Sequence, residues 1–136
     1  MNDLLFVERA QSLLRDRGIE TWVFGGWGEE LRGLIRPREH ADLDLLYPSE
    51  TWEEVDGLTG LDWVPGKRRP WKRAFVLDGV LVELVLVERD AQGAWFTGLG
   101  RRRHVWPADT FAANGRLPVA SAAALTGYRG SYRRAA

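Results

Sequence analysis

The sequence predicts an α+β fold in which a mixed, twisted sheet is flanked by helices, with the alternating order of elements that is typical of α/β proteins. The first half of the chain reads as helix, strand, helix, strand and helix, and several strands follow. The chain has 136 residues, of which 45% are hydrophobic and 11% aromatic, so it can bury a core of its own. We therefore expect a single domain over residues 1–136.

Residues 1–48 predict two helices that alternate with two strands. Apolar residues first recur with a period near 3.6, and this pattern begins after Asn2 or Asp3 and ends at Gly18, which suits a helix with a capped start. Pro37 is expected to stop the second helix, because proline cannot continue a helical hydrogen-bond ladder. The expected elements are a helix over 3–17, a strand over 19–25, a helix over 27–35 and a strand over 41–48.

The remaining residues predict a hairpin between less regular segments. Asp78-Gly79 lies between two β-rich runs, which is a strong signal for a two-residue hairpin turn. Ser49 is expected to begin a third helix, and Ser121 to cap the last one. The expected elements are a helix over 49–58, a strand near 61–64, a basic loop over 66–70, hairpin strands over 71–77 and 80–87, a strand over 116–120 and a helix from 122 to about 132, whereas residues 89–110 give no clear assignment.

Composition excludes several classes of function. The formal net charge is zero, so no overall field attracts the protein to nucleic acid or to a membrane surface. The absence of cysteine excludes disulfides, thiolate zinc sites and cysteine nucleophiles. The first residues lack the pattern of a signal peptide, and no apolar run approaches the roughly 18 residues of a membrane span. We expect a soluble cytoplasmic protein without a membrane or nucleic-acid partner.

Three acids in apolar strands are the candidate catalytic residues. Asp42 and Asp44 are two positions apart, so on a strand both side chains lie on one face. Glu83 is the only charge within the apolar run 80–87, and pairing of the two strands would bring all three carboxylates together. Adjacent carboxylates ionise together only beside a cation, and Mg²⁺ suits such oxygen ligands. The alternative for the first pair is two solvated acids at a sheet edge.

A glycine turn and a basic loop lie beside these acids in the sequence. Gly25 and Gly26 stand between a strand and a helix, where they let the backbone approach a phosphate. Arg38 suits a phosphate by bidentate bonding, and His40 could be a ligand, a phosphate contact or a structural hydrogen-bonding group. Trp27 is the tryptophan that we expect near a bound base or ring. An ordinary tight turn and a solvated loop are the alternatives.

Together these residues resemble the minimal nucleotidyltransferase fold of the DNA polymerase beta superfamily, and within it the small lincosamide and aminoglycoside nucleotidyltransferases. The resemblance rests on a Gly-Gly-Trp turn, a helix, and a Thr-Arg-x-His-x-Asp-x-Asp pattern. It continues to an acid on a later strand and weakly to residues 115–128. In this chain Pro37 replaces the threonine. The matching residues are Gly25, Gly26, Trp27, Arg38, His40, Asp42, Asp44 and Glu83.

The resemblance implies transfer of a nucleoside monophosphate from an NTP, such as ATP, to a hydroxyl of an aminoglycoside- or lincosamide-like molecule, with release of pyrophosphate. It implies that Asp42 and Asp44 hold Mg²⁺, and that Glu83 completes the metal site, acts as general base, or both. All three carboxylates should then lie within reach of one ion. Gly25 and Gly26 would cradle the terminal phosphates, with Trp27, Arg38 and His40 as further nucleotide-binding candidates.

The resemblance also leaves alternatives open. Aminoglycoside-modifying members usually carry a further helical domain, which this sequence does not show. The acceptor site would then be built from the core domain, from residues 89–110 or from a second subunit, and we expect a homodimer. A non-catalytic nucleotide- or ligand-binding domain on the same fold is one alternative function. A transferase that acts on tRNA or protein is the other, and the basic run over 101–103 would then matter.

Overall fold

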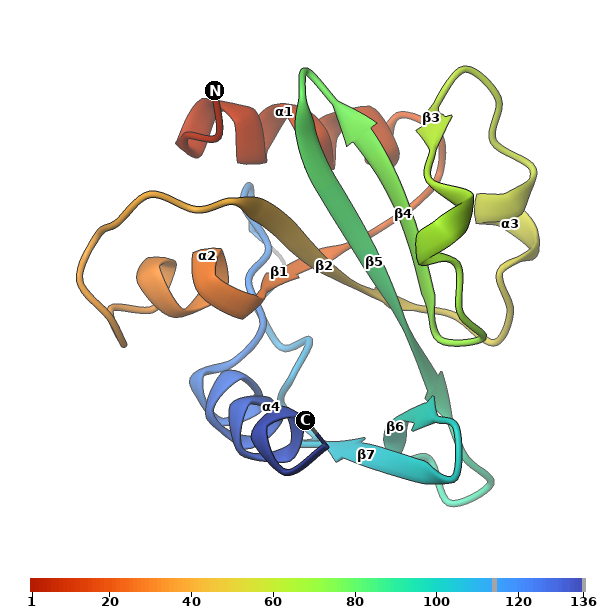
Figure 1. Ribbon diagram of the computed structural model, residues 1–136. Helices are drawn as coiled ribbons and strands as arrows, with labels where there is room; N and C mark the ends of the chain where they lie inside the picture. Colours follow the sequence, from red (N-terminus) through yellow and green to blue (C-terminus); the bar gives the residue numbers. More distant parts are fainter. Residues whose placement is uncertain (114, 136) are drawn as a thin grey trace.

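The computed structural model describes residues 1–113 and 115–135 and shows a mixed sheet flanked by helices, which confirms the predicted fold class (Figure 1). The main strand order is β1-β2-β5-β4-β3, in which β2 and β5 are parallel and the other neighbours antiparallel. A second hairpin, β6–β7, extends the sheet from the end of β5. The strands are β1 (Trp22–Phe24), β2 (Asp42–Pro48), β3 (Asp62–Trp63), β4 (Lys72–Leu77), β5 (Val80–Arg89), β6 (Trp95–Leu99) and β7 (Arg102–Trp106).

Helices cover both faces of this sheet. One core joins α1 to the face that carries Leu43, Leu45 and Leu84, all of them fully buried. A second core joins α4 and β7 to the opposite face at Leu46 and Val85. The helices are α1 (Leu4–Arg15), α2 (Gly25–Leu31), α3 (Glu53–Asp56) and α4 (Ala122–Ala135), with a 3-10 turn η1 (Pro65–Lys67).

The first helix forms as its sequence predicts. The Asp3 side chain accepts a hydrogen bond from the Phe6 backbone N–H at 2.9 Å, and Gly18 follows the helix with a positive φ of 84°.

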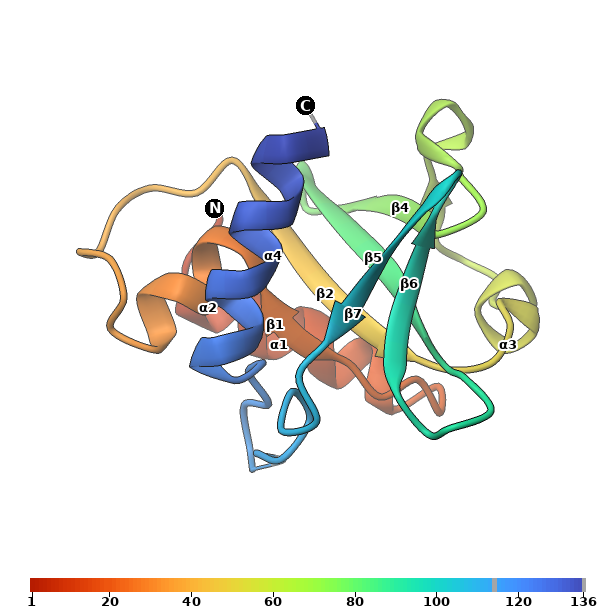
Figure 2. The same cartoon turned by 90° about the horizontal axis from the view of Figure 1, so that it is seen from below.

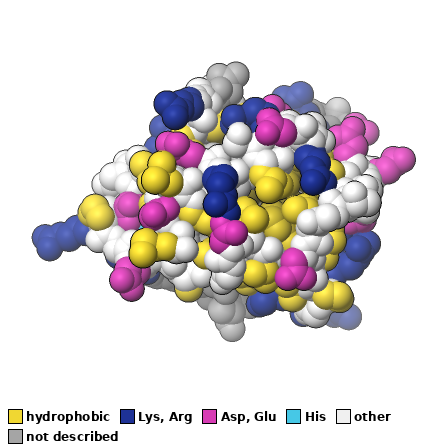
Figure 3. All heavy atoms as spheres, turned by 90° about the horizontal axis from the view of Figure 1, so that it is seen from above, with side chains coloured by type: hydrophobic (Ala, Val, Ile, Leu, Met, Phe, Trp, Pro, Cys, Tyr) yellow, Lys and Arg dark blue, Asp and Glu magenta, His cyan; other side chains and the backbone are white. Residues whose placement is uncertain are grey.

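In the view from above, acidic, basic and hydrophobic side chains are interspersed (Figure 3). That face therefore presents no continuous basic surface.

Two of the predicted helices have different limits. The second begins at Gly25 rather than 27 and ends at Leu31 rather than 35, so the glycines form its first turn and Pro37 lies beyond its end. The third is a single turn, Glu53–Asp56. The reason is local, because the Ser49 hydroxyl bonds the Thr51 carbonyl oxygen instead of capping a helix.

The later part of the chain contains the larger differences. Residues 89–110, which the sequence leaves unassigned, contain the β6–β7 hairpin, with Gly100 at its turn at a φ of 69°. Residues 116–120, predicted as a strand, form one isolated bridge between Val119 and Val23. The last helix agrees with its prediction, since Ser121 Oγ accepts a hydrogen bond from the Ala124 N–H at 3.1 Å.

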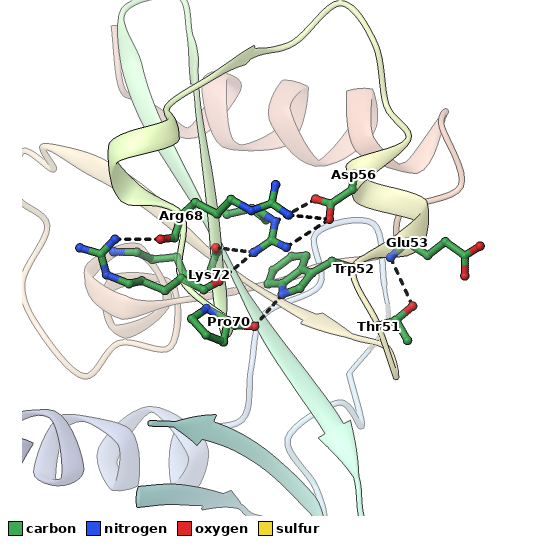
Figure 4. Close-up of polar contacts among 9 residues, drawn as sticks. Thr51, Trp52, Glu53, Asp56, Arg68, Pro70 and Lys72 are labelled. Carbon is green, nitrogen blue, oxygen red and sulfur yellow. Dashed lines mark hydrogen bonds and ion pairs between the residues drawn. The ribbon is translucent and has the colours of Figure 1, made fainter. Parts of the chain in front are cut away.

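An ion pair fastens the short third helix to the sheet. Arg73 of β4 is only 7% exposed, and its Nε lies 2.8 Å from Oδ1 of Asp56. Its guanidinium also lies over the Trp52 ring, 4.6 Å from the centroid, and the Trp52 indole N–H donates to the Pro70 carbonyl at 2.9 Å (Figure 4). The hydrogen bond from Arg73 lowers the pKa of the Asp56 carboxyl.

We predict that Asp56→Ala lowers the free energy of unfolding by about 1–2 kcal/mol, because it leaves the buried Arg73 guanidinium without its counter-charge. This is less than a fully buried pair would lose, since the Asp56 side chain is 33% exposed. Urea unfolding at pH 7 measures the loss. Because the folded pKa is depressed, this contribution is complete above the unfolded pKa near 3.8 and disappears as the pH falls through the folded value.

Glu20→Ala is the control for this prediction. Glu20 pairs with Arg15 at 3.6 Å, and both side chains are exposed. Its removal should change the free energy of unfolding by no more than about 0.5 kcal/mol. Equal losses in the two variants would contradict a special role of the Asp56 pair.

Candidate functional site

The parallel pairing of β2 with β5 brings the predicted carboxylates together. Asp44 is the direct cross-strand partner of Glu83, and Asp42 is the partner of Leu81. Between the two aspartates, Leu43 is fully buried on the opposite face, as strand alternation requires. Because β2 is flanked by β1 and β5, Asp42 and Asp44 do not lie on an edge strand. The alternative of a solvated edge acid therefore does not hold for Asp44, which pairs with Phe24 on one side and Glu83 on the other, whereas Asp42 lies beyond the last residue pair between β1 and β2.

The acids occupy only the beginning of their sheet face. Farther along the same face, Leu46, Val85 and Val87 are buried under α4 and β7. Viewed from below, β2 and β5 are seen between α4 and β7 (Figure 2). The carboxylates therefore lie where a covered, apolar face becomes accessible, and the Glu83 side chain keeps 16% exposure.

The surroundings of Asp44 disfavour its charged form. Burial, and then the negative charges of Asp42 and Glu83, raise the pKa of Asp44 from 3.8 to about 8. A hydrogen bond to Glu83 contributes as well, and such a bond between two carboxyl groups requires one of them to hold a proton. The Lys72 ammonium acts in the opposite direction and lowers this pKa. The arrangement thus holds more negative charge than its own cation neutralises.

The donor set fits a divalent cation such as Mg²⁺, which binds carboxylate oxygens and relieves their repulsion. Within residues 1–113 and 115–135, however, no group of three or more acidic or histidine side chains converges closely enough to hold one ion. The expectation that all three carboxylates reach a single ion is therefore not met as the side chains lie. Glu83 is paired instead with a cation of the protein itself, since the Lys72 Nζ lies 3.7 Å from its Oε2.

Gly25 allows Asp44 to sit where it does. Gly25 has a φ of +65°, and a Cβ added to it would lie 2.4 Å from the Asp44 Oδ2 atom, well inside van der Waals contact. Only glycine meets both conditions, because side chains strain this backbone conformation and would displace the carboxylate. The glycine turn and the acidic strand are thus one packed unit.

His40 and Arg38 brace the loop that leads into β2. The Glu30 carboxylate accepts the Arg38 backbone N–H at 2.9 Å and bonds His40 Nε2 at 2.9 Å. The His40 side chain is only 3% exposed. The bond from the Arg38 backbone, followed by the one from His40, lowers the pKa of Glu30. Of the roles that the sequence leaves open for His40, these contacts support structural hydrogen bonding.

Trp27 also makes internal contacts. It is 6% exposed, its ring lies 4.4 Å from that of His40, and its indole N–H donates to Asn2 Oδ1 at 2.8 Å. The Asn2 amide in turn donates to the carbonyl oxygens of His40 and Asp42. These contacts support packing, and the proximity of Trp27 to a base or ring stays a prediction.

Three residues that shape this site are not among those predicted from the sequence, namely Asn2, Glu30 and Lys72. For Lys72 a signal exists, because a two-residue turn at Asp78-Gly79 fixes the pairing of β4 with β5 and places Lys72 diagonally from Glu83. Asn2 joins segments far apart in the sequence, and Glu30 bonds the loop that follows its own helix. We find no sequence pattern that predicts either contact.

The basic residues of the loop 66–70 and of the run 101–103 pair with acids other than Asp42, Asp44 and Glu83. Arg68 pairs with Asp56 at 3.2 Å. The Arg103 guanidinium lies 3.5 Å from Asp90 Oδ2, and its Cζ atom lies over the Phe96 ring, 3.8 Å from the centroid.

Among the described residues, no helix is long and apolar enough to cross a membrane.

Comparison with known proteins confirms the resemblance to the nucleotidyltransferase superfamily. A family model for aminoglycoside-2''-adenylyltransferase matches residues 7–60, which include the glycine turn and both aspartates. No curated protein matches the chain. Solved structures at 17% identity or less share the fold over nearly the whole chain, and their similarity indicates fold rather than substrate.

Three of these structures illustrate the similarity. ANT(2")-Ia in complex with adenylyl-2"-tobramycin has a TM-score of 0.65 at 17% identity, over 98% of this chain and 76% of that one. The lincosamide antibiotic adenylyltransferase LnuA, lincomycin-bound, has a TM-score of 0.66 at 17% identity, over 97% and 87%. A Thermotoga maritima protein described as a nucleotidyltransferase has a TM-score of 0.52 at 15% identity, over 97% and 88%.

We predict that Gly25→Ala destabilises the protein by more than the roughly 1 kcal/mol that left-handed backbone strain costs an alanine. The additional loss comes from the contact with Asp44, which must move. Gly33→Ala is the matched control, because Gly33 has a φ of +72° and nothing lies within 4 Å of an added Cβ. Thermal unfolding of both variants measures the difference, and equal losses would refute the steric coupling.

The raised pKa of Asp44 predicts how the stability of the metal-free protein depends on pH. Between the unfolded pKa of 3.8 and the folded value of about 8, the folded state holds a proton that the unfolded state releases. Stability in EDTA should therefore fall as the pH rises through this window, at up to about 1.4 kcal/mol per pH unit. Urea unfolding at pH 6, 7 and 8 measures the slope.

Asp44→Asn is the comparison for this slope, because asparagine has no titrating group at this position. Burial lowers the pKa of His104, which gives a slope of opposite sign below pH 6.5, but both proteins share that slope. The difference between wild type and variant thus isolates Asp44. Parallel pH profiles would show that Asp44 titrates normally.

Proposed function

We propose that this protein transfers a nucleoside monophosphate from an NTP to a hydroxyl group of a small molecule and releases pyrophosphate. The observation that carries the proposal is the juxtaposition of Asp44 and Glu83 on β2 and β5, with Asp42 on the same face and Gly25 packed against Asp44. The family-model match over residues 7–60 supports it, because it spans the glycine turn and the aspartates.

In this proposal Asp42 and Asp44 hold Mg²⁺. When bound, the ion supplies neutralisation of the negative charge that develops on the phosphates. The absence of side chains at Gly25 and Gly26 lets the backbone approach the terminal phosphates closely. Arg38 and His40 keep the loop before β2 in place through their bonds to Glu30.

Glu83 then serves as general base for the acceptor. The acceptor hydroxyl oxygen forms a bond to the α-phosphorus, the bond from that phosphorus to the pyrophosphate oxygen breaks, and the hydroxyl proton passes to the Glu83 carboxylate. This role suits a carboxylate that is partly exposed and lies directly beside Asp44.

The acceptor class is inferred from the structures that share this fold. One of them contains adenylyl-2"-tobramycin and another contains lincomycin. We accordingly propose an aminoglycoside- or lincosamide-like acceptor and ATP as the first NTP to test. A homodimer and a cytoplasmic location stay predictions.

We predict pyrophosphate release that requires both Mg²⁺ and an acceptor, measured with each of four NTPs against aminoglycosides, lincosamides and tRNA. Asp42→Asn should reduce the rate about 100-fold or more, because it removes a charged ligand of the ion. Asp62→Asn, at an exposed position on β3, is the matched control and should leave the rate unchanged.

The same experiment separates the alternatives. Stabilisation by Mg²⁺ and NTP without pyrophosphate release would support a nucleotide-binding domain and contradict the transferase. Release only with tRNA, accompanied by salt-dependent RNA binding, would contradict a small-molecule acceptor. A melting temperature that no NTP changes would argue against both nucleotide-dependent functions.

A further inference from the structure

Lys72 enters the carboxylate site from the side opposite the glycine turn. Its Nζ lies 3.7 Å from Glu83 Oε2, and the two side chains are 24% and 16% exposed. An ion pair with this degree of burial is screened less by water than an exposed pair.

The hairpin register places Lys72 there. Ala74 lies directly across from Glu83, and Lys72 lies across from Val85, two positions away on the same face. Ala74 is small and buried, so it leaves the space above it to a longer side chain from a diagonal position. The Lys72 backbone is fixed by paired hydrogen bonds with Arg69, each 3.1 Å long.

The order of strands assigns Lys72 to one side of the proposed reaction. The glycine turn follows β1, and β2, β5 and β4 come next in order across the sheet. Phosphates at the glycine turn and Lys72 would thus lie on opposite sides of Glu83. In an in-line transfer the acceptor approaches opposite the departing pyrophosphate, so Lys72 is on the acceptor side.

The charge of Lys72 affects how many divalent ions the three carboxylates can bind. Asp42, Asp44 and Glu83 carry three negative charges when ionised. In the absence of nucleotide, one divalent ion and one ammonium neutralise them, whereas two divalent ions beside an ammonium would leave excess positive charge. Lysine suits this place because its ammonium is a compact point charge on a flexible stem.

We propose that Lys72 is a positioning residue whose ammonium takes the place of a second cation beside Glu83, so that the nucleotide-free site binds one divalent ion, at Asp42 and Asp44. Glu83 is thereby held on the acceptor side as a base rather than as a metal ligand. This inference rests on the proposed nucleotidyltransferase function.

The test is a titration with Mn²⁺ in the absence of nucleotide. Wild type should bind one ion per chain. Lys72→Met should bind Mn²⁺ about tenfold more tightly and accept a second ion, because a positive charge a few ångströms away no longer opposes binding. Lys67→Met, which removes the other lysine of the chain from the exposed turn η1, should behave as wild type.

Kinetics with the acceptor found for the wild type give a second readout. Lys72→Met should lower kcat at least tenfold with little change in the KM for NTP, and Lys72→Arg should restore part of kcat because it keeps the charge. A residue that merely stabilised the fold would change melting temperature without this pattern. Lys72→Gln repeats both measurements with a polar side chain, should the methionine variant not fold.

The outcomes separate this inference from the proposed function. If wild type binds no Mn²⁺, the metal-dependent function itself fails. If wild type binds one ion and the Lys72 variants bind it with unchanged affinity and stoichiometry, the role of Lys72 is refuted while the transferase proposal stands. Two ions of similar affinity in wild type would also overturn the role of Lys72.

Discussion

The parallel pairing of β2 with β5 is the constraint on which the candidate site depends. It places Asp44 beside Glu83 from a segment 39 residues farther along the chain. A slip of one residue in this pairing would turn Glu83 to the α1 face of the sheet, where it would be buried without a partner. The hairpin β4–β5 resists such a slip, because its two-residue turn fixes where β5 begins.

One face of the sheet carries the apolar core that stabilises the fold, and the other carries the candidate catalytic carboxylates. On the α1 face, Leu43, Leu45, Val82 and Leu84 are fully buried in one continuous core. That core offsets the cost of the carboxylates on the other face, where burial and then repulsion from Asp42 and Glu83 raise the pKa of Asp44. Strand alternation makes this division possible, because consecutive residues serve opposite purposes.

Much of this fold can be predicted from sequence, because its early elements carry strong local signals. The period of apolar residues predicts α1, and Asp78-Gly79 predicts the hairpin that carries Glu83. The hairpin β6–β7 is not predicted, because Gly98 interrupts β6 and the pairing of β6 with β5 spans only two residue pairs. The contact of Lys72 with Glu83 is not predicted for a different reason, since it follows only from the register of β4 with β5.

The Gly-Gly-Trp turn and the Arg-x-His-x-Asp-x-Asp segment are better understood as one packed unit than as separate ligands. An added Cβ at Gly25 would meet Asp44, and one at Gly26 would lie 2.9 Å from His40 Nδ1. The Trp27 ring packs against the same histidine, 4.4 Å between centroids and tilted by 34°. Spacing along the chain therefore reflects how the turn fits against the acidic strand. It follows that several residues near the acids act on the proposed chemistry through position, and that the charged groups which act directly are few.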